Sequence, residues 1–200
     1  MTTISRLTLE VSDLPAAADF YAAFGVGDRI ALRASDAPTT GFRGCTISLV
    51  VARPNVVDAF VEAALAAGAT AIKPVRKSFW GYGGVLEAPD GTLWKVATSG
   101  KRNDGPADRA IDDLVLLLGV EDVKATKEFY TGRGLEVAKS FGSKYVDFEA
   151  PASAVKLALY GRKAAAKDAG VPPEGSGSHR IVVHSDGGDF ADPDGFTWTA

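Results

Sequence analysis

Cysteine and histidine are scarce in this sequence of 200 residues, which contains one cysteine, Cys45, and two histidines. A single cysteine excludes an intrachain disulfide, which favours a reducing compartment, and we expect the protein in the cytoplasm. Two histidines argue against a histidine-rich metal site. We interpret Cys45 as a small buried residue rather than a nucleophile, because Arg43, a nearby cation, would lie a strand step away.

Long apolar runs and an excess of basic charge are absent as well. No stretch approaches the roughly 18 uninterrupted apolar residues of a membrane span. The start of the chain lacks the basic segment and apolar run of a secretory signal. The 22 Lys and Arg residues are outnumbered by 25 Asp and Glu, which gives a net charge of −3. We therefore expect no membrane insertion and no nucleic-acid partner.

The sequence does contain the composition of a globular domain and an internal repeat. Apolar residues make up 46% and charged residues 24%, which suits a chain with a sizeable core. Four short segments recur in the same order about half a chain length later. The pairs are Val11–Leu14 with Val120–Val123, Asp19–Tyr21 with Glu128–Tyr130, Gly25 with Gly134, and Ala88–Trp94 with Asp192–Trp198.

The repeat divides the chain into two modules. The first spans residues 1–98 and the second residues 111–200, while the polar segment 99–110 has the composition of a linker. Each module opens with a strand and a helix. In the first, polar and apolar residues alternate before Asp13, which is placed as the helix N-cap, and Gly25 ends the helix.

The remaining patterns predict further elements and a difference between the modules. In the first module we predict a helix over residues 56–67 and strands over residues 47–52, 70–73, 82–86 and 93–97. In the second we predict strands over residues 145–149, 155–160 and 180–184 and a short helix over residues 162–169. The second module is truncated: too few residues precede its Pro-Asp-Gly turn to hold the helix that the first module has there.

A β-α-β-β-β unit that occurs twice, with Pro-Asp-Gly before its last strand, resembles the vicinal oxygen chelate superfamily. This superfamily includes glyoxalase I, extradiol dioxygenases and the fosfomycin- and bleomycin-resistance proteins. Residues 56–97 follow its pattern in order, and residues 164–177 resemble a loop of the glyoxalase/bleomycin-resistance branch. The resemblance implies an α+β fold in which two βαβββ modules form cupped mixed or antiparallel sheets around a cavity, with the second module shortened.

Metal-dependent members of that superfamily hold a divalent ion with His, Gln or Glu on the first strand of each module and usually Glu on the last. The resemblance maps these positions to Arg6 and Val115 on the first strands and to Lys95 and Thr199 on the last. Valine has no donor atom, arginine keeps its proton, lysine adds positive charge, and threonine is a poor lone ligand. We therefore expect no metal and no cofactor.

A site without metal would combine charge with aromatic surface. Arg6 and Lys95 offer charge-assisted hydrogen bonds to an acidic ligand, and aromatic side chains offer stacking area. The candidate ligand-binding residues are Arg6, Thr8, Glu10, Phe79, Trp80, Tyr82, Lys95, Val115 and Leu117. Trp94 and Trp198 neighbour the mapped positions, so strand alternation predicts that they face the core.

Three functions remain open. We favour a metal-free protein that binds a small molecule, a drug or a metabolite, because the lost ligand set resembles the bleomycin-resistance branch. The alternative is a glyoxalase-like lyase or isomerase, or a dioxygenase, with Glu10 and Asp113 as its catalytic carboxylates, through a shifted metal site or metal-free acid–base chemistry. The third is a structural or regulatory module that binds nothing.

The truncated module also predicts a homodimer. Without its helix, one face of the second sheet would be bare near Val182 and His184. Apolar area is stabilised by burial, so a second copy would cover this face. The opposing expectation is a monomer in which the helix at residues 162–169 folds back over the gap.

Overall fold

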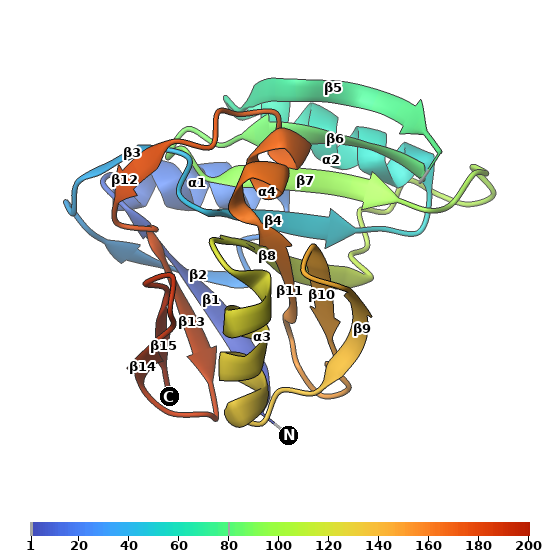
Figure 1. Ribbon diagram of the computed structural model, residues 1–200. Coiled ribbons are helices and arrows are strands. Elements are labelled where there is room, and N and C mark those ends of the chain that lie inside the picture. The colour runs from blue at the N-terminus through green and yellow to red at the C-terminus, as the bar shows by residue number, and fades with distance from the viewer. Residues whose placement is uncertain (1, 80) are drawn as a thin grey trace.

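The computed structural model describes residues 2–79 and 81–200, in which the chain forms two main sheets (Figure 1). The larger sheet has eight strands, in the order β5 (Thr70–Ser78), β6 (Gly81–Glu87), β7 (Leu93–Thr98), β4 (Cys45–Val50), β8 (Asp113–Val120), β11 (Lys156–Gly161), β10 (Tyr145–Phe148) and β9 (Val137–Phe141). The smaller has five, in the order β14 (Phe190–Ala191), β15 (Thr197–Thr199), β13 (Ile181–Ser185), β1 (Ile4–Val11) and β2 (Ile30–Ala34). A short ribbon pairs β12 (Gly175–Gly177) with β3 (Thr39–Gly41).

The helices are α1 (Leu14–Phe24), α2 (Pro54–Ala66), α3 (Val123–Gly132) and α4 (Arg162–Ala169). The predicted ends of α1 are confirmed: the Asp13 side chain accepts a hydrogen bond from Ala16 N, and Gly25 ends the helix in the left-handed region. Helix α2 begins two residues earlier than predicted, because Pro54 is accommodated in the first turn, where its missing N–H is not needed.

Within the eight-stranded sheet the β-α-β-β-β order occurs twice, as β4-α2-β5-β6-β7 and as β8-α3-β9-β10-β11. Antiparallel pairing of β4 with β8 joins these units into the eight-stranded sheet. Antiparallel pairing of β1 with β13 joins the start of the chain to its end in the five-stranded sheet. Each sheet therefore contains strands from both halves of the repeat. The α+β class with mixed sheets is confirmed, and so is the shortened second half, where only residues 186–189 separate β13 from β14.

The apolar faces of both sheets contribute to one hydrophobic core, to which α1, α2 and α3 also add buried residues. Leu9 of β1 and Ile47 of β4 are 1% and 0% exposed. Trp94 and Trp198 are 0% and 1% exposed, which confirms that they face the core. We call the opposite face of each sheet its outer face. The outer faces carry the side chains that alternate with these core residues.

Several short strands were not predicted. They are β2, β3, β9, β12 and β14, of which β12 lies in a segment predicted as a loop. All five residues of β9 are exposed, so no apolar alternation marks it in the sequence. Strands β3 and β12 are three residues long and owe their pairing to each other rather than to a local pattern.

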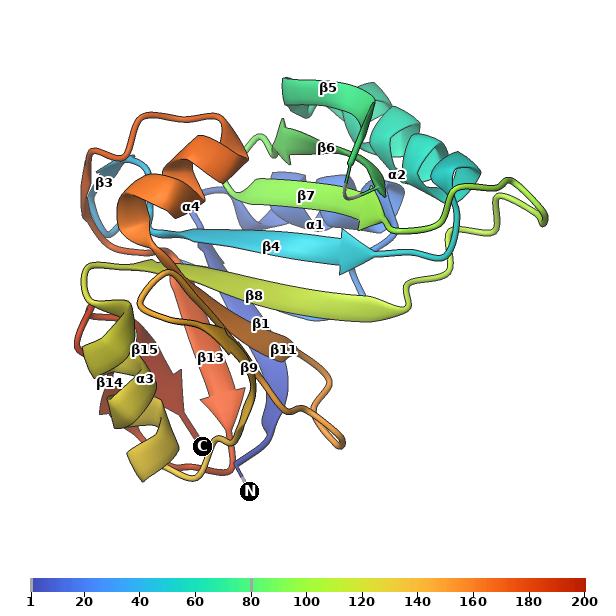
Figure 2. The same cartoon turned by 45° about the vertical axis from the view of Figure 1, so that its right-hand side comes forward.

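Helix α4 packs on the outer face of the eight-stranded sheet, against β4, β8 and β11 (Figure 2). Its buried alanines contact Phe42 and Leu93. The expectation that this helix folds back over the second sheet near β13 is wrong, because its alanine face packs on the eight-stranded sheet instead. Val182, expected on a bare apolar face, is 4% exposed within the single chain. The homodimer stays a prediction that light scattering can test.

No helix in the described part of the chain is long and apolar enough to cross a membrane.

Candidate ligand-binding site

The central strands of the eight-stranded sheet carry a row of neighbouring side chains on their outer face. Across β7, β4, β8 and β11, the strand register aligns Lys95, Ser48, Val115 and Lys156. Two residues predicted for the site, Lys95 and Val115, thus lie in one row, and Leu117 follows two residues along β8 on the same face. We call these four aligned residues the central row.

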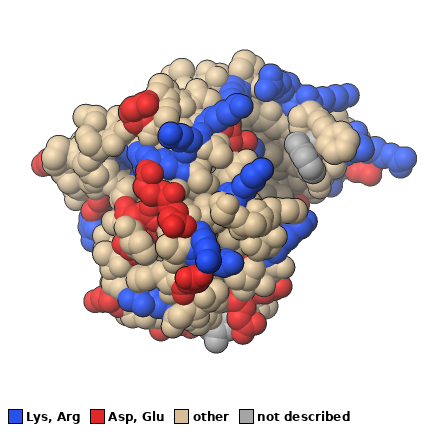
Figure 3. All heavy atoms as spheres, in the orientation of Figure 1, with Lys and Arg blue, Asp and Glu red and all other residues tan. Residues whose placement is uncertain are grey.

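Both lysines of the central row are held in ion pairs. Lys95 Nζ lies 2.8 Å from Asp168 Oδ2 of α4, and Lys156 Nζ lies 2.8 Å from Asp113 Oδ2. Lys73 also links β5 to α4, because its Nζ donates to the backbone oxygens of Lys167 and Asp168 at the end of that helix. The positive charge of the row is therefore matched by carboxylates of the same chain. Figure 3 likewise shows basic and acidic side chains interspersed on this side of the molecule.

The outer face of the five-stranded sheet holds a different group. Arg6 of β1 lies opposite His184 of β13, which lies opposite Thr199 of β15. Thr8 Oγ1 lies 2.7 Å from His184 Nε2. Arg6, Thr8 and Glu10 thus belong to a different sheet from Lys95 and Val115, and the structure does not bring the two sets together.

The two carboxylates named for the enzyme alternative are also separated. Glu10 Oε1 pairs with Arg33 Nη2 at 2.6 Å on the five-stranded sheet. Asp113 pairs with Lys156 on the eight-stranded sheet. Each carboxylate already has a cation of its own, so the structure does not combine them into one catalytic pair.

The predicted aromatic residues do not join either group. Tyr82 OH donates to Asp58 Oδ1 of α2 at 2.7 Å, and this bond raises the pKa of the tyrosine. Tyr82 therefore faces α2 and the core side of the sheet. Phe79 is 89% exposed beside the turn between β5 and β6. Trp80 lies outside the described residues.

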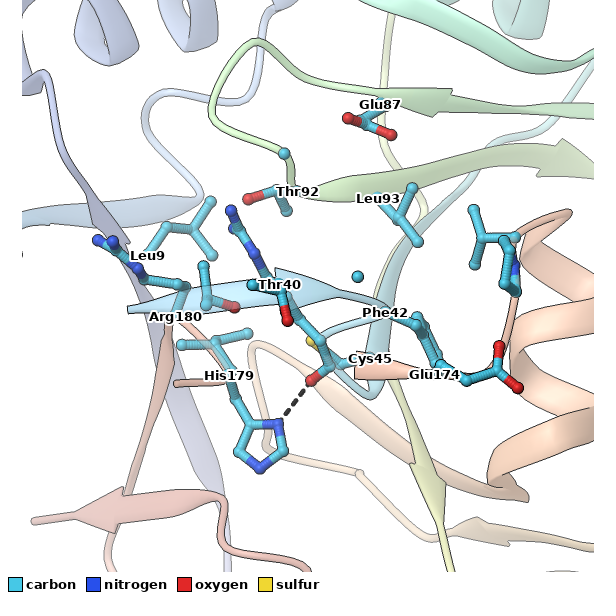
Figure 4. A pocket seen from close by; sticks show the side chains of 17 residues that line it. Leu9, Thr40, Phe42, Cys45, Glu87, Thr92, Leu93, Glu174, His179 and Arg180 are labelled. Atoms are coloured by element: carbon cyan, nitrogen blue, oxygen red, sulfur yellow. Dashed lines mark hydrogen bonds between the residues drawn. The ribbon is translucent and has the colours of Figure 1, made fainter. Parts of the chain in front are cut away.

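A pocket of about 390 Å³ opens where the two sheets meet, between the β3–β4 segment, the turn before β7 and the loop after α4 (Figure 4). Its apolar wall comes from both sheets, with Leu9 and Ile181 from one and Leu93 from the other. Its polar lining includes Arg43, Arg180, Glu87, Glu174 and His179. The volume is within the range of roughly 300–1,000 Å³ that is typical of small-molecule sites.

Arg43 is fixed by the turn before β7. Its Nη2 donates to Asp90 O at 2.6 Å. Gly91, in the same Pro-Asp-Gly turn, has φ of +82°, and a Cβ built on it would lie 2.7 Å from Arg43 Nη2. The glycine is therefore needed both for the left-handed turn and for the close approach of the guanidinium. Within the described chain Arg43 forms no salt bridge.

Arg180 has an unusual backbone. Its φ is +56°, one of only two positive values at non-glycine residues in the described chain. Such a conformation is costly for a residue with a Cβ and is often found at functional sites. Its Nη1 donates to Ser35 O, while its buried Nε has no partner among the described residues.

His179 lines the pocket and contacts the backbone of Arg43. Its Nδ1 lies 2.5 Å from Arg43 O and its Nε2 3.0 Å from Asp194 O. The ring stacks on Phe196 with centroids 3.8 Å apart. Because both ring nitrogens lie within hydrogen-bond distance of backbone oxygens, His179 positions the Arg43 segment.

Cys45 lines the same pocket without being reactive. Burial raises the pKa of its thiol to about 12, although Arg43 and Arg162 act in the opposite direction. The thiolate is the nucleophilic form, so at neutral pH this cysteine stays protonated and inert. This agrees with the interpretation of Cys45 as a small buried residue.

Solved structures of known proteins share this architecture over most of the chain. Glyoxalase I from Zea mays matches with a TM-score of 0.62 at 15% sequence identity, covering 99% of this chain and 91% of the maize protein. A candidate dioxygenase from Bacillus subtilis matches with a TM-score of 0.60 at 14% identity, covering 91% of this chain and 69% of that protein. The chain has the vicinal oxygen chelate fold. No protein-family model and no curated protein matches the sequence.

At such low identity the likeness establishes the vicinal oxygen chelate fold and not an activity, so the metal positions of the fold have to be judged on their chemistry. The mapped positions are Lys95 and Val115 in one sheet and Arg6 and Thr199 in the other. Two ammonium groups in the central row would repel a divalent cation, and the carboxylates beside them are already paired. Across residues 2–79 and 81–200, no three His, Cys, Asp or Glu side chains gather as a possible ion site. These residues do not fit the metal that the fold implies.

Sequence reasoning missed the pocket, although one signal was present. Glu87 ends β6 and Arg180 precedes β13, while Arg43 and Glu174 lie on irregular segments, so no periodicity groups them. The glycine of the Pro-Asp-Gly turn was visible, but its role beside a guanidinium depends on a contact across 48 residues.

Proposed function

We propose that this protein is a metal-free binding protein for a small molecule, either a drug or a metabolite, and that its ligand occupies the pocket beside Arg43. The observation that carries the proposal is the state of the charged residues around this pocket. Arg43, Arg180, Glu87 and Glu174 line it, and none of them forms a salt bridge within the described chain.

Unpaired charges in a partly enclosed site are costly unless something compensates them. A guanidinium or carboxylate that loses water without gaining a partner is destabilising by several kcal/mol in the extreme case of full burial (on the order of 3–5). Arg43 and Glu87 are half-buried, so part of that cost applies to them. A ligand that supplies the missing charges would be stabilised by them, and this supports binding at the pocket.

The shape of the pocket supports the same function. Leu9, Ile181 and Leu93 provide apolar surface for the body of a ligand, and a few polar groups remain to orient it. The central row lacks this combination, because α4 packs over part of it and its lysines are already neutralised. We therefore place the ligand at the junction of the sheets rather than on the outer face.

A thermal-shift screen tests the proposal. Purified protein and its Arg43→Met variant would be screened against a panel of metabolites and aromatic antibiotics. A ligand at about 100 times its Kd should stabilise the wild-type fold by about 2.7 kcal/mol, and the variant should respond less. If no compound stabilises the wild type, or if every hit stabilises the variant equally, the pocket is not the binding site.

Elemental analysis tests the metal-free part separately. Protein purified without chelators should contain far less than one equivalent of Zn, Ni, Mn or Fe. One full equivalent, lost on replacement of Glu10 or Asp113, would instead favour the enzyme alternative.

A further inference from the structure

We infer that the ligand of this pocket is a zwitterion, with an anionic group and a cationic amino group at opposite ends of an apolar body. The inference rests on the proposed function and names the class of ligand. The pocket is lined by two arginines and two glutamates, yet none of these four residues pairs with another. Opposite charges that share a pocket without meeting leave two separate places for a ligand to complement.

The basic side chains of the pocket are Arg43 and Arg180. Their guanidinium groups donate to Asp90 O and Ser35 O, backbone carbonyls that accept a hydrogen bond but do not neutralise a positive charge. A guanidinium carries five N–H groups, so each arginine keeps donors for a further acceptor. Carboxylates and phosphates match this donor geometry, often through two parallel bonds.

The acidic end is formed by Glu87 and Glu174. Glu87 is half-buried at the end of β6, and Glu174 is exposed in the loop after α4. Figure 4 places Arg180 on one side of the pocket and both glutamates on the other. A ligand with only a negative charge would meet repulsion at this end, and a purely cationic ligand would meet it at the other.

The middle of the pocket suits an apolar spacer. Leu9 lies on the side of Arg180, and Leu93 lies towards the glutamates (Figure 4), while Ile181 adds apolar lining. Thr39 Oγ1 also lines the pocket and has no hydrogen-bond partner in the described chain, so one polar group on the spacer could be accommodated. These walls keep the two charged ends of a ligand apart.

Three matched probes test the inference by isothermal titration calorimetry at low salt. 4-(Aminomethyl)benzoate carries both charges, 4-methylbenzoate carries only the anion, and benzylamine carries only the cation. The zwitterion should bind at least tenfold more tightly than either of the others. Equal or tighter binding of a singly charged probe, or no binding of the zwitterion, would overturn the inference.

Charge-neutral variants assign the two ends. Arg43→Met should reduce the affinity for the zwitterion to about that of benzylamine, and the double variant Glu87→Gln/Glu174→Gln should reduce it to about that of 4-methylbenzoate. Arg102→Met and Glu62→Gln, at exposed positions outside the pocket, serve as matched controls and should leave binding unchanged. Circular dichroism and thermal melting would confirm that each variant is folded. An affinity that the pocket variants do not change would place the charges elsewhere.

The outcomes separate the inference from the proposed function. If 4-methylbenzoate binds as well as the zwitterion and Arg43→Met abolishes both, the pocket binds small molecules but does not select a zwitterion. If the zwitterion binds and no pocket variant affects it, the proposed site itself is wrong.

Discussion

Two groups of charged residues on this molecule differ in whether their charges are compensated. In the central row, Lys95 and Lys156 each meet a carboxylate of the same chain at 2.8 Å. In the pocket, Arg43, Arg180 and the two glutamates meet no opposite charge within the described chain. The row contains Lys95 and Val115, two of the positions to which the resemblance maps metal ligands, and the pocket lies at the junction of the sheets. Internal ion pairs can therefore neutralise the charged residues of one region, while charged residues in another region of the same fold remain available to a ligand.

The ion pair and hydrogen bonds formed by the lysines also hold α4 against the central row. Asp168 of α4 bonds Lys95, and the last carbonyls of the helix accept from Lys73. Lysine at a helix C-terminus is favoured by the helix dipole. The loop that follows α4 contains Glu174 and leads to β12, and it forms part of the pocket wall. Helix α4 and the loop after it therefore contribute both to the ion pairing of the central row and to the wall of the pocket.

The largest effect we expect concerns the thiol in the pocket. With its pKa raised from 9.0 to about 12, Cys45 should contain about a thousandfold less thiolate at neutral pH than an ordinary cysteine. Native protein should therefore react with iodoacetamide about a thousandfold more slowly than unfolded protein. Comparable rates in the two states would contradict the raised pKa, and faster reaction of the native protein would show that the pocket holds an activated cysteine.

The same thiol predicts how stability depends on pH. The folded state holds the proton more tightly than the unfolded state, so its contribution is fully present below about pH 9 and is lost as the pH rises towards about 12. The Cys45→Ala variant should lack this part of the decline. Urea unfolding at pH 8 and pH 10.5 measures the decline in the free energy of unfolding. An equal decline in the variant and the wild type would contradict the raised pKa of the buried thiol.

The next effect compares arginines from two regions. Arg43→Met should weaken an anionic or zwitterionic ligand about tenfold or more, since a hydrogen bond to a charged group contributes about 1.5–3 kcal/mol. Arg6→Met, on the outer face of the five-stranded sheet, should leave the dissociation constant unchanged. The reverse order in a calorimetric titration would restore Arg6 to the site that the sequence predicted for it.

A smaller effect should appear at Arg180. Because its φ is +56°, glycine should suit this position better than alanine by about 1 kcal/mol. Arg180→Gly should therefore be more stable in urea than Arg180→Ala, while both lose affinity for the ligand. Equal stability of the two variants would show that the backbone here is not strained.

The smallest effect belongs to the central row. Lys95→Met removes a half-exposed ion pair, so the free energy of unfolding should fall by no more than about 1 kcal/mol, with less change at high salt. Ligand affinity should stay as in the wild type. A large loss of affinity in Lys95→Met would make the row, and not the pocket, the functional site.

The fold could be predicted from the sequence further than the site could. Alternation placed Trp94 and Trp198 in the core, and the repeated motifs pointed to the correct superfamily fold. Register then set Lys95 and Val115 in one row, because equivalent positions of neighbouring strands meet in a sheet. Arg6 and Thr199 were assigned by the same motifs but lie on the other sheet, since the two halves contribute strands to both sheets.

The pocket could not be predicted in this way. Arg43 and Glu174 lie on irregular backbone, where no period of two or 3.6 residues tells which way a side chain points. Their presence in one pocket depends on how β3 pairs with β12 and on a glycine at φ of +82° beside the guanidinium. Such contacts are set by tertiary packing rather than by local pattern.

Amide chemical-shift mapping during titration with 4-(aminomethyl)benzoate shows where on the protein the ligand binds. If the ligand binds beside Arg43, the largest shifts should fall on Thr39–Arg43, on Thr92 and on His179–Ile181. Shifts centred on Ser48, Lys95 and Val115, with the pocket residues unaffected, would contradict the account and return the site to the outer face of the eight-stranded sheet.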